Sequence, residues 1–295
     1  MIMMEPFPDS VSESPLEQYS NLRFLLEEEI RSLLAGVESD PLRPALDHAT
    51  SGGKRIRPML TMIACAAVGG RAEQAVQAAV AVELLHASSL IHDDIMDKAA
   101  VRRSKSTVYR IFGSELAILA GDILVALAYR SLAKTDPRTL DQVLPCFTDG
   151  FVWTCEGQAA DVSNVSDGGD QEHRLMVEKK TARLIETAAA LGGLAGNAKQ
   201  VQLKALRGFG LNIGMAYQAQ DDLLDAVGSV EQTGKSVGLD GRNGRDSFAS
   251  RSPEKIERFV EQYTERAYDN LDMLPDSPHR NSLRHLAESL VGRSK

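Results

Sequence analysis

The sequence predicts an all-α protein. From residue 16 onward, alanine, leucine, glutamate, glutamine and arginine are prominent, and all of them favour helices. Apolar residues recur at intervals of three and four positions, which places them on one face of a helix. Runs that alternate apolar and polar residues between hairpin turns are missing, so the pattern gives no indication of strands.

The expected helices follow one another along the whole chain. They cover residues 16–36, 54–69, 72–98, 107–133, 138–162, 171–195, 200–226, 253–272 and 279–292. Two stretches, Gln74 to Ile91 and Thr181 to Leu194, are apolar or alanine-rich around most of their circumference, which is typical of helices inside a bundle. Glycine, serine and charged residues gather at 163–170 and 228–253, and the second segment has the length of a functional loop.

The chain is expected to consist of a flexible tail, residues 1–15, and one all-α domain, residues 16–295. The tail is acidic and contains prolines, whereas a secretory signal needs a basic start and a continuous apolar segment. The most hydrophobic window, Leu116 to Leu132, is interrupted by Asp122 and Arg130, so it falls short of a membrane span. We therefore expect a cytoplasmic protein without a transmembrane segment.

Charge and cysteine content exclude several classes of partner and site. The formal net charge is -8 and the pI is about 5.4, which argues against a general surface for nucleic acid or anionic membranes. Cys65, Cys146 and Cys155 are widely spaced, so neither a disulfide framework nor a zinc site is indicated, and buried thiols are expected.

Two acidic segments repeat the pattern Asp-Asp-X-X-Asp. The first contains Asp93, Asp94 and Asp97, and the second contains Asp221, Asp222 and Asp225. In a helix, residues four positions apart share a face, so each segment directs two repelling carboxylates the same way. A single segment of this kind would indicate a solvated helix end. Two identical segments favour binding of Mg²⁺, which prefers one or two carboxylates together with substrate phosphates.

Basic residues accompany both acidic segments. The stretch SGGKRIRP, residues 51–58, brings Lys54, Arg55 and Arg57 to the start of a helix, where free amides and the helix dipole also favour anions. Further cations are Arg102, Arg103, Lys179, Lys180 and Lys235. An isolated basic pair is usually a surface feature, but cations beside two metal-site candidates are what a bound diphosphate requires.

These segments together resemble the trans-polyprenyl diphosphate synthase family, the head-to-tail isoprenoid chain elongators. The resemblance covers Ser51 to about Asp240 and rests on segments that occur in the family's order, namely GGKRIRP, LIHDDIMDKAAVRR, GQAAD, KTARL, YQAQDDLLD and GKSVGLD. It implies an isoprenoid synthase-like bundle of about ten or more helices around a central cavity. It also implies Mg²⁺-dependent 1′-4 condensation of isopentenyl diphosphate with an allylic diphosphate, and a homodimer.

The resemblance further implies roles for individual residues. Asp93 and Asp97 are expected to bind two of three Mg²⁺ ions, and Asp221, Asp225 and Asp240 the third. Isopentenyl diphosphate is expected at Gly53, Lys54, Arg57, His86 and Arg103. The allylic diphosphate is expected at Asp94, Arg102, Gln158, Asp161, Lys180, Asp222 and Lys235, with Lys180, Lys235 and Arg102 holding the departing diphosphate. Thr181 and Gln218 are expected to place oxygen atoms near the allylic cation.

Product length is expected to depend on residues close to the first acidic segment. Ser88 and Ser89 stand where farnesyl-forming members often place an aromatic residue, which favours a product longer than fifteen carbons. Phe151 and Phe147 return to the face of Gln158 about two and three turns earlier, so they are candidates for the tunnel floor, although ordinary core packing is the alternative. Geranylgeranyl diphosphate is the expected product, with longer chains or farnesyl diphosphate as alternatives.

Three departures from the family pattern are Ser104, Ser106 and Arg245, and none of them removes a metal ligand. A class I terpene cyclase would usually carry a different second metal segment, and a non-catalytic subunit of a heteromeric synthase would be expected to lack some of the aspartates. Two side chains are expected to be structural: His92 as a hydrogen-bonding neighbour of Asp93, and Trp153 as a core residue.

Overall fold

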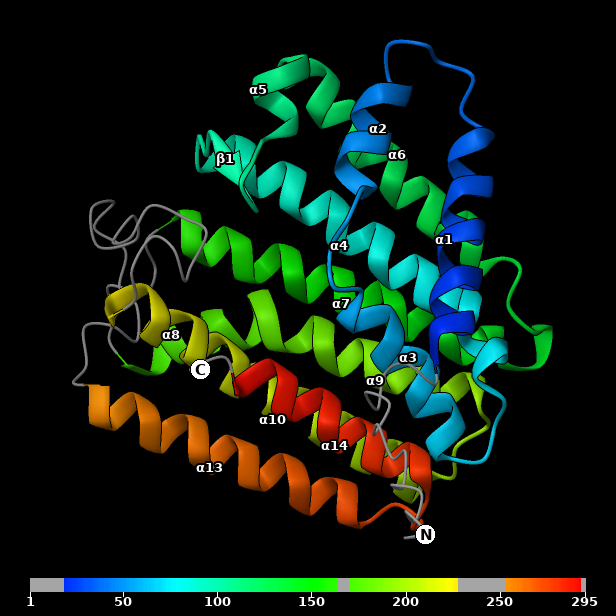
Figure 1. Cartoon of the computed structure of the whole chain (residues 1–295), viewed down its shortest axis with the longest axis vertical. Coiled ribbons are helices and arrows are strands. Elements are labelled where there is room, and N and C mark those ends of the chain that lie inside the picture. Colours follow the sequence, from blue (N-terminus) through cyan, green and yellow to red (C-terminus); the bar gives the residue numbers. More distant parts are fainter. Residues whose placement is uncertain (1–18, 164–169, 228–252, 293–295) are drawn as a thin grey trace, which may run out of the picture.

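The computed structural model describes residues 19–163, 170–227 and 253–292. The expected tail, residues 1–15, lies outside these ranges. Within them the chain is helical almost throughout, and the helices form one bundle (Figure 1). The predicted all-α fold is therefore confirmed. The division into a tail and a single domain remains a prediction.

The N-terminal part runs as far as the helix that carries GQAAD. Its elements are α1 (Ser20–Ala35), α2 (Arg43–Thr50), α3 (Ile56–Ala67), a 3-10 turn (Ala72–Ala75), α4 (Val76–Met96), β1 (Val101–Arg102), β2 (Lys105–Ser106), α5 (Val108–Phe112), α6 (Ser114–Leu132) and α7 (Pro137–Val162). The C-terminal part continues with α8 (Asp170–Val177), a π-helix (Glu178–Ala182), α9 (Arg183–Ala195), α10 (Gln200–Val227), α13 (Pro253–Asp272) and α14 (Pro278–Val291).

Local sequence explains where several helices begin. Asp136 directly precedes Pro137, the first residue of α7, and its side chain accepts a hydrogen bond from the Arg138 amide (2.9 Å). Ser277 accepts one from the Arg280 amide (3.1 Å) directly before Pro278, the first residue of α14. A capping side chain followed by proline satisfies an exposed amide and fixes the backbone angle that the first helical turn needs.

The structure differs from the predicted helices in four places. The short helix α2 was not predicted. The expected helix 107–133 is divided at Gly113, whose φ of 88° breaks the helical backbone between α5 and α6. The expected helix 171–195 is interrupted by the π-helix. A hairpin of β1 and β2 joins α4 to α5, and its two turn residues, Arg103 and Ser104, both have positive φ.

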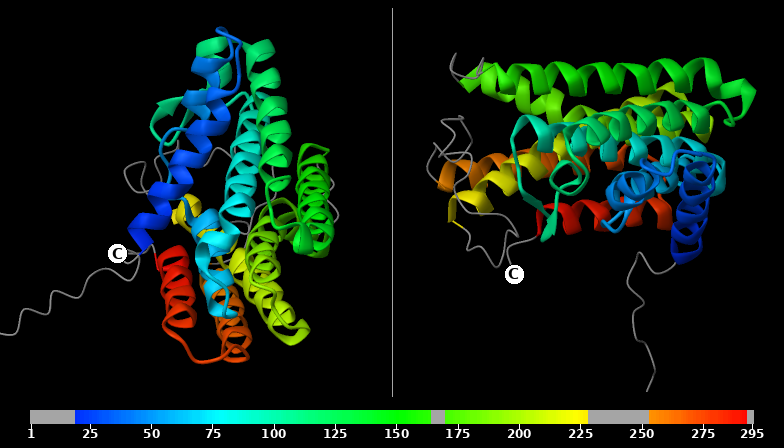
Figure 2. Two further views of the ribbon diagram at one scale, coloured as in Figure 1. Left: turned by 90° about the vertical axis from the view of Figure 1, so that its right-hand side faces the viewer. Right: turned by 90° about the horizontal axis from the view of Figure 1, so that it is seen from above.

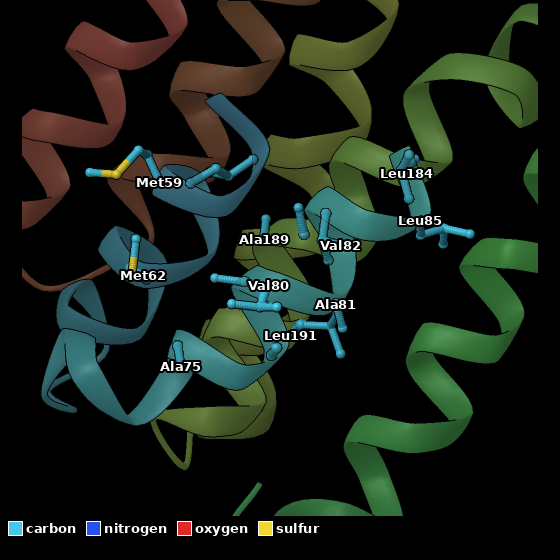
Figure 3. Packing of buried hydrophobic residues seen from close by; sticks show 14 of the residues in the cluster. Met59, Met62, Ala75, Val80, Ala81, Val82, Leu85, Leu184, Ala189 and Leu191 are labelled. Atoms are coloured by element: carbon cyan, nitrogen blue, oxygen red, sulfur yellow. The ribbon is translucent and has the colours of Figure 1, made fainter. Parts of the chain in front are cut away.

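Helix α4 lies in the centre of the hydrophobic core. Figure 3 shows Val80, Val82 and Leu85 of α4 among side chains of α3 and α9, such as Met62 and Leu191. The stretch Ala72–Met96 is long and apolar enough to span a membrane, but 72% of its most apolar window is buried inside the bundle. Each large side chain buried in this way contributes roughly 1.5–3 kcal/mol, so α4 is the core helix that its all-round apolar sequence predicts.

Helix α7 lies along one side of the bundle in both views of Figure 2. Its outer surface exposes Leu144 and Val152, and the neighbouring α6 exposes Ile118 and Leu119. We call these four residues the α6–α7 apolar residues. The cysteine prediction holds for Cys65 and Cys146, which are buried, but is wrong for Cys155, which α7 exposes.

Candidate active site

A cavity of about 640 Å³ opens between the helices that carry the predicted motifs. Its lining comes from the loop before α3, from the start of α3, from α4, the hairpin, α7, α8, the π-helix, α9 and α10. The predicted site residues that line it are Gly53, Lys54, Arg57, His86, Ser89, Asp93, Asp97, Arg102, Arg103, Gln158, Asp161, Lys180, Thr181, Gln218, Asp221 and Asp222. Segments far apart in the sequence thus meet at one site.

The loop before α3 forms part of a basic wall, which we define by Lys54, Arg57, His86 and Arg103. Gly52 and Gly53 have φ values of 76° and 91°, which residues with a side chain rarely adopt. A Cβ on Gly53 would lie 2.9 Å from Nη1 of Arg103. Glycine at this position therefore allows the hairpin arginine to approach the loop.

Arg55 belongs to the same loop but is held by carboxylates. Its guanidinium donates to both carboxylate oxygens of Glu27 (2.7 and 3.0 Å), to Oε1 of Glu83 (2.6 Å) and to the carbonyl of Thr50 (2.6 Å). Burial alone would lower the pKa of Arg55, but the hydrogen bonds and charges of the two glutamates raise it. Arg55 therefore anchors the loop to α1 and α4, which agrees with its omission from the isopentenyl diphosphate site that the resemblance implies.

Arg57 and His86 form a hydrogen-bonded pair on the basic wall. Nη1 of Arg57 donates to Nε2 of His86 (3.2 Å), since a guanidinium can only donate. Burial, followed by the charges of Arg57 and Arg103, lowers the pKa of His86 well below 6.5, and burial also lowers the pKa of Arg57. His86 is thus a neutral acceptor that orients Arg57.

Another part of the cavity lining is acidic, and we call Asp93, Asp97, Asp221 and Asp222 the acidic wall. Burial raises the pKa of Asp93 to about 6, and the charges of Asp97 and Asp94 raise it further, against the opposing effects of Lys180 and Arg102. The acidic wall is therefore a place where a cation would relieve repulsion between carboxylates.

Asp94 occupies a different position from its neighbours. It is buried and does not line the cavity, and its Oδ1 accepts a hydrogen bond from Nε of Arg102 (2.6 Å). It therefore holds Arg102, which does line the cavity. The side chain of Asp225 and the residues Lys235 and Asp240 lie outside the described residues.

The π-helix between α8 and α9 presents two predicted residues to the cavity. Nζ of Lys180 donates to Oδ2 of Asp161 on α7 (2.7 Å), and Oγ1 of Thr181 donates to Oε1 of Gln218 on α10 (2.9 Å). Gln218 in turn donates from Nε2 to Oδ1 of Asp222 (2.8 Å). The π-helix is thereby connected to both neighbouring helices.

Gln158 of α7 is only 8% exposed, and it lines the cavity. Neither its amide oxygen nor its amide nitrogen has a hydrogen-bond partner in the described part of the chain. Because a buried polar group without a partner is costly, this amide is positioned for a polar group of a bound molecule.

Arg183 supports the π-helix from α9. It donates to Glu178, the first residue of the π-helix, and to Oε2 of Glu186 (2.7 Å). The other oxygen of Glu186, Oε1, accepts from Arg207 (3.1 Å). The guanidinium of Arg183 lies 4.8 Å from the ring centroid of Trp153 on α7. Trp153 is therefore only partly a core residue, since it also forms a cation–π contact.

The four residues predicted to limit product length are placed at different depths. Ser89 lines the cavity, whereas Ser88 is buried and does not. Phe147 is fully buried beside Tyr129, with ring centroids 5.3 Å apart, and Phe151 packs against the core. Neither phenylalanine lines the cavity, so Ser89 alone of the four meets it directly.

Several lining residues were not predicted as site residues. Glu83 precedes His86 by one helical turn on α4, and Tyr217 stands directly before Gln218 on α10, so their spacing would have indicated the same face or segment. The apolar lining of Met176, Val177 and Leu184 carried no such signal. His92 points instead to α6, where its Nε2 lies 3.4 Å from the carbonyl of Ile118, and it does not line the cavity.

Comparison with known proteins identifies this arrangement. A model of the family described as "Polyprenyl synthetase" matches residues 39–266. The geranylgeranyl pyrophosphate synthase of Geoglobus acetivorans is 33% identical over 91% of this chain and 96% of its own, and a short chain isoprenyl diphosphate synthase of Methanothermobacter thermautotrophicus is 38% identical over 78% and 71%.

Solved structures have the same fold. The crystal structure of a geranylgeranyl pyrophosphate synthetase from Pyrococcus horikoshii gives a TM-score of 0.81 at 32% identity, covering 94% of this chain and 98% of that one. A polyprenyl synthase from Caulobacter crescentus, solved with calcium and isoprenyl diphosphate, gives a TM-score of 0.83 at 25% identity, covering 94% of this chain and 96% of that one. The chain belongs to the polyprenyl synthetase family and is a trans-prenyltransferase.

Proposed function

We propose that the protein condenses isopentenyl diphosphate with an allylic diphosphate and releases geranylgeranyl diphosphate. One observation carries this proposal: a single cavity is lined by both a basic wall and an acidic wall. A diphosphate can bind the basic wall directly, while a second diphosphate needs a cation to approach the acidic wall. The relatives from Geoglobus acetivorans and Pyrococcus horikoshii, both named for geranylgeranyl pyrophosphate synthesis, support the choice of product.

Isopentenyl diphosphate is assigned to the basic wall. Lys54, Arg57 and Arg103 supply positive charge, and Gly53 leaves room for the phosphates beside Arg103. Neutral His86 orients Arg57 without adding charge of its own. Arginine is suited to this task because its planar donors match phosphate oxygens.

The acidic wall fits Mg²⁺, which members of this family use. Among the described residues, no three histidine, cysteine or acidic side chains lie close enough to hold a metal by themselves. That agrees with the preference of Mg²⁺ for one or two carboxylates completed by phosphate oxygens. We assign Asp93 and Asp97 to two ions and Asp221, with Asp225 and Asp240, to a third. When bound, the ions would neutralise charge on the leaving diphosphate.

The chain's own residues act on the allylic substrate. Its C1–O bond breaks and the electron pair leaves with the diphosphate, which Lys180, Arg102 and Lys235 are proposed to hold. The double bond of isopentenyl diphosphate then forms the new bond to C1, and the proton lost from its C2 passes to the diphosphate. Thr181 and Gln218 place oxygen atoms beside the cation, and apolar residues such as Leu184 help to exclude water.

The decisive experiment is a product assay. Purified protein is incubated with Mg²⁺, isopentenyl diphosphate and, in turn, dimethylallyl, geranyl or farnesyl diphosphate, and the chain length of the dephosphorylated products is measured. We expect mainly the twenty-carbon alcohol. Fifteen-carbon or longer products would correct the assigned length, cyclic hydrocarbons would indicate a terpene cyclase, and no condensation with any primer would contradict the proposal.

We further propose a homodimer formed through the α6–α7 apolar residues, and a cytoplasmic location. Ile118, Leu119, Leu144 and Val152 are 40–49% exposed on adjacent helices, and apolar residues that are exposed together often mark a protein–protein interface. Light scattering after gel filtration should give twice the chain mass. Val152→Asp should halve that mass, and a monomeric wild type would contradict this part of the proposal. Cell fractionation tests the location.

A further inference from the structure

The π-helix lies between α7 and α10, and each of these helices approaches it at a glycine. A Cβ on Gly157 of α7 would lie 2.2 Å from the amide nitrogen of Lys180 and 2.6 Å from its Cα. A Cβ on Gly214 of α10 would lie 2.6 Å from the Cα of Ala182. These are backbone atoms, so the contacts cannot be relieved by moving a flexible side chain.

Each glycine stands one helical turn before a residue that bonds to the π-helix. Asp161, four positions after Gly157, accepts from Lys180, and Gln218, four positions after Gly214, accepts from Thr181. Residues four positions apart share a helix face, so the glycine contact sets the distance at which the next turn can form its hydrogen bond. The same relation holds independently on both sides of the π-helix.

The turn of α7 that begins at Gly157 also places Gln158 in the cavity. This side chain is almost fully buried, and both of its amide atoms are without a partner in the described ranges, which points to a bound ligand at this turn. A shift of α7 away from the π-helix would therefore displace Asp161, Lys180 and Gln158 together.

We propose that Gly157 and Gly214 are positioning residues for the prenyl transfer. Together they form what we call the glycine clasp: two side-chain-free positions that hold the π-helix between α7 and α10, so that Lys180 and Thr181 face the cavity. A π-helix is a rare conformation that often occurs at functional sites, and close packing on both sides stabilises it here. This inference rests on the proposed function, since Lys180 and Thr181 act on the allylic substrate.

Gly157→Ala and Gly214→Ala test the clasp, and the chain offers a matched control on each helix. Gly150 of α7 and Gly210 of α10 also lie against α9, where a Cβ would be 2.4 Å from Oγ1 of Thr187 and 2.7 Å from the Cα of Glu186. The contacts at Gly210 are with backbone atoms, as at the clasp glycines, and those at Gly150 are with the β-branched side chain of Thr187. Both control positions are therefore crowded, but the atoms that crowd them belong to α9 and not to the π-helix. All four alanine variants should unfold at lower temperatures than the wild type.

The kinetic result should separate the two pairs. We expect the kcat of both clasp variants to fall about a hundredfold, because a displacement of about 1 Å in a positioning group has effects of this size. The KM for the allylic diphosphate should rise, while the KM for isopentenyl diphosphate should stay near the wild-type value. The reason is that Lys180 and Thr181 bond to α7 and α10, whereas the basic wall belongs to the start of α3, to α4 and to the hairpin. The controls should change kcat only a few-fold.

A second pair of variants keeps the test decisive if the clasp variants do not fold. Arg183→Met removes the hydrogen bond to Glu178 in the π-helix. Arg207→Met instead removes the hydrogen bond from Arg207 to Glu186 and a contact with Sγ of Cys146, neither of which involves the π-helix. Arg183→Met should lower kcat about tenfold more than Arg207→Met. Equal kinetics for clasp and control variants, or for the two arginine variants, would overturn the inference. An inactive wild type would instead overturn the proposed function.

Discussion

The two walls of the cavity carry their charges in different ways. In the described part of the chain, Arg57 and Arg103 of the basic wall have no carboxylate within ion-pair distance. Beside the acidic wall, by contrast, Lys180 is paired with Asp161 (2.7 Å) and Arg102 with Asp94 (2.6 Å). Arg57 and Arg103 can therefore receive an anion, whereas the two cations beside the acidic wall are already paired with carboxylates.

This difference teaches that one cavity can separate two similar ligands by charge. A diphosphate is attracted to the basic wall without help, but it can approach the acidic wall only if cations intervene. Helix α4 joins the walls, because His86 and Asp93 lie two turns apart on nearly the same face. Single substitutions on this helix can therefore test each wall separately, at His86 for the basic wall and at Asp93 for the acidic wall.

The largest effect is expected on the acidic wall. Asp93→Asn should lower kcat about 10²–10³-fold in Mg²⁺, because charge stabilisation of the leaving diphosphate is the main catalytic contribution. The KM for isopentenyl diphosphate should change little. Asp122→Asn, on the exposed surface of α6, is the control. If Asp93→Asn instead raises only the KM for isopentenyl diphosphate and leaves kcat unchanged, the two substrates are assigned to the wrong walls.

Two arginines at the start of α3, Arg55 just before it and Arg57 in its first turn, should separate binding from stability. Arg57→Met should raise the KM for isopentenyl diphosphate about 10–100-fold, since a hydrogen bond to a charged group contributes about 1.5–3 kcal/mol. Arg55→Met should instead lower the free energy of unfolding by about 3 kcal/mol, because it leaves Glu83 buried without its partner. Steady-state kinetics and urea unfolding distinguish these outcomes, and a reversed result would make Arg55 the substrate ligand.

The space between the walls should be sensitive to bulk on α4. Ser89→Phe places an aromatic ring at the cavity lining and should shorten the main product from twenty to fifteen carbons. Ser88→Phe adds the same bulk at a buried position, where overpacking should cost about 1–3 kcal/mol of stability. Product chromatography measures the first effect. A larger change of product for Ser88→Phe would place the growing chain beside Ser88.

The smallest effect is expected from His86 and depends on pH. The pKa of His86 is lowered well below its ordinary 6.5 in the folded protein. Just below pH 6.5 the unfolded chain therefore binds more protons at this histidine than the folded protein does. This contribution to stability is present above pH 6.5 and is lost as the pH falls below it. When the pH is lowered from 7.5 to 5.5, the free energy of unfolding of the wild type, measured with urea, should fall by about 1 kcal/mol more than that of His86→Gln. Exposed His285→Gln should behave like the wild type.

Much of the site was predictable because its pattern is local. Asp93 and Asp97, like Asp221 and Asp225, share a helix face by their spacing alone, and the order of the motifs along the chain is enough to indicate the family. Arg55 shows where local pattern fails. Its partners Glu27 and Glu83 are each 28 residues away, so the charge pattern alone could not distinguish this anchored cation from Arg57, and only the family resemblance left Arg55 out of the diphosphate site.

The sequence by itself therefore determined the helical fold, the two acidic segments and the basic stretch, since helical periodicity and motif spacing are properties of neighbouring residues. The class of reaction followed from the resemblance of the ordered motifs to a known family. Only the tertiary structure decided that Asp94 lies behind the wall, that Ser89 rather than Ser88 meets the cavity, and that a π-helix interrupts the expected helix 171–195. These features depend on which backbones pack against each other, as at Gly157 and Gly214, and such contacts join residues that the sequence keeps far apart.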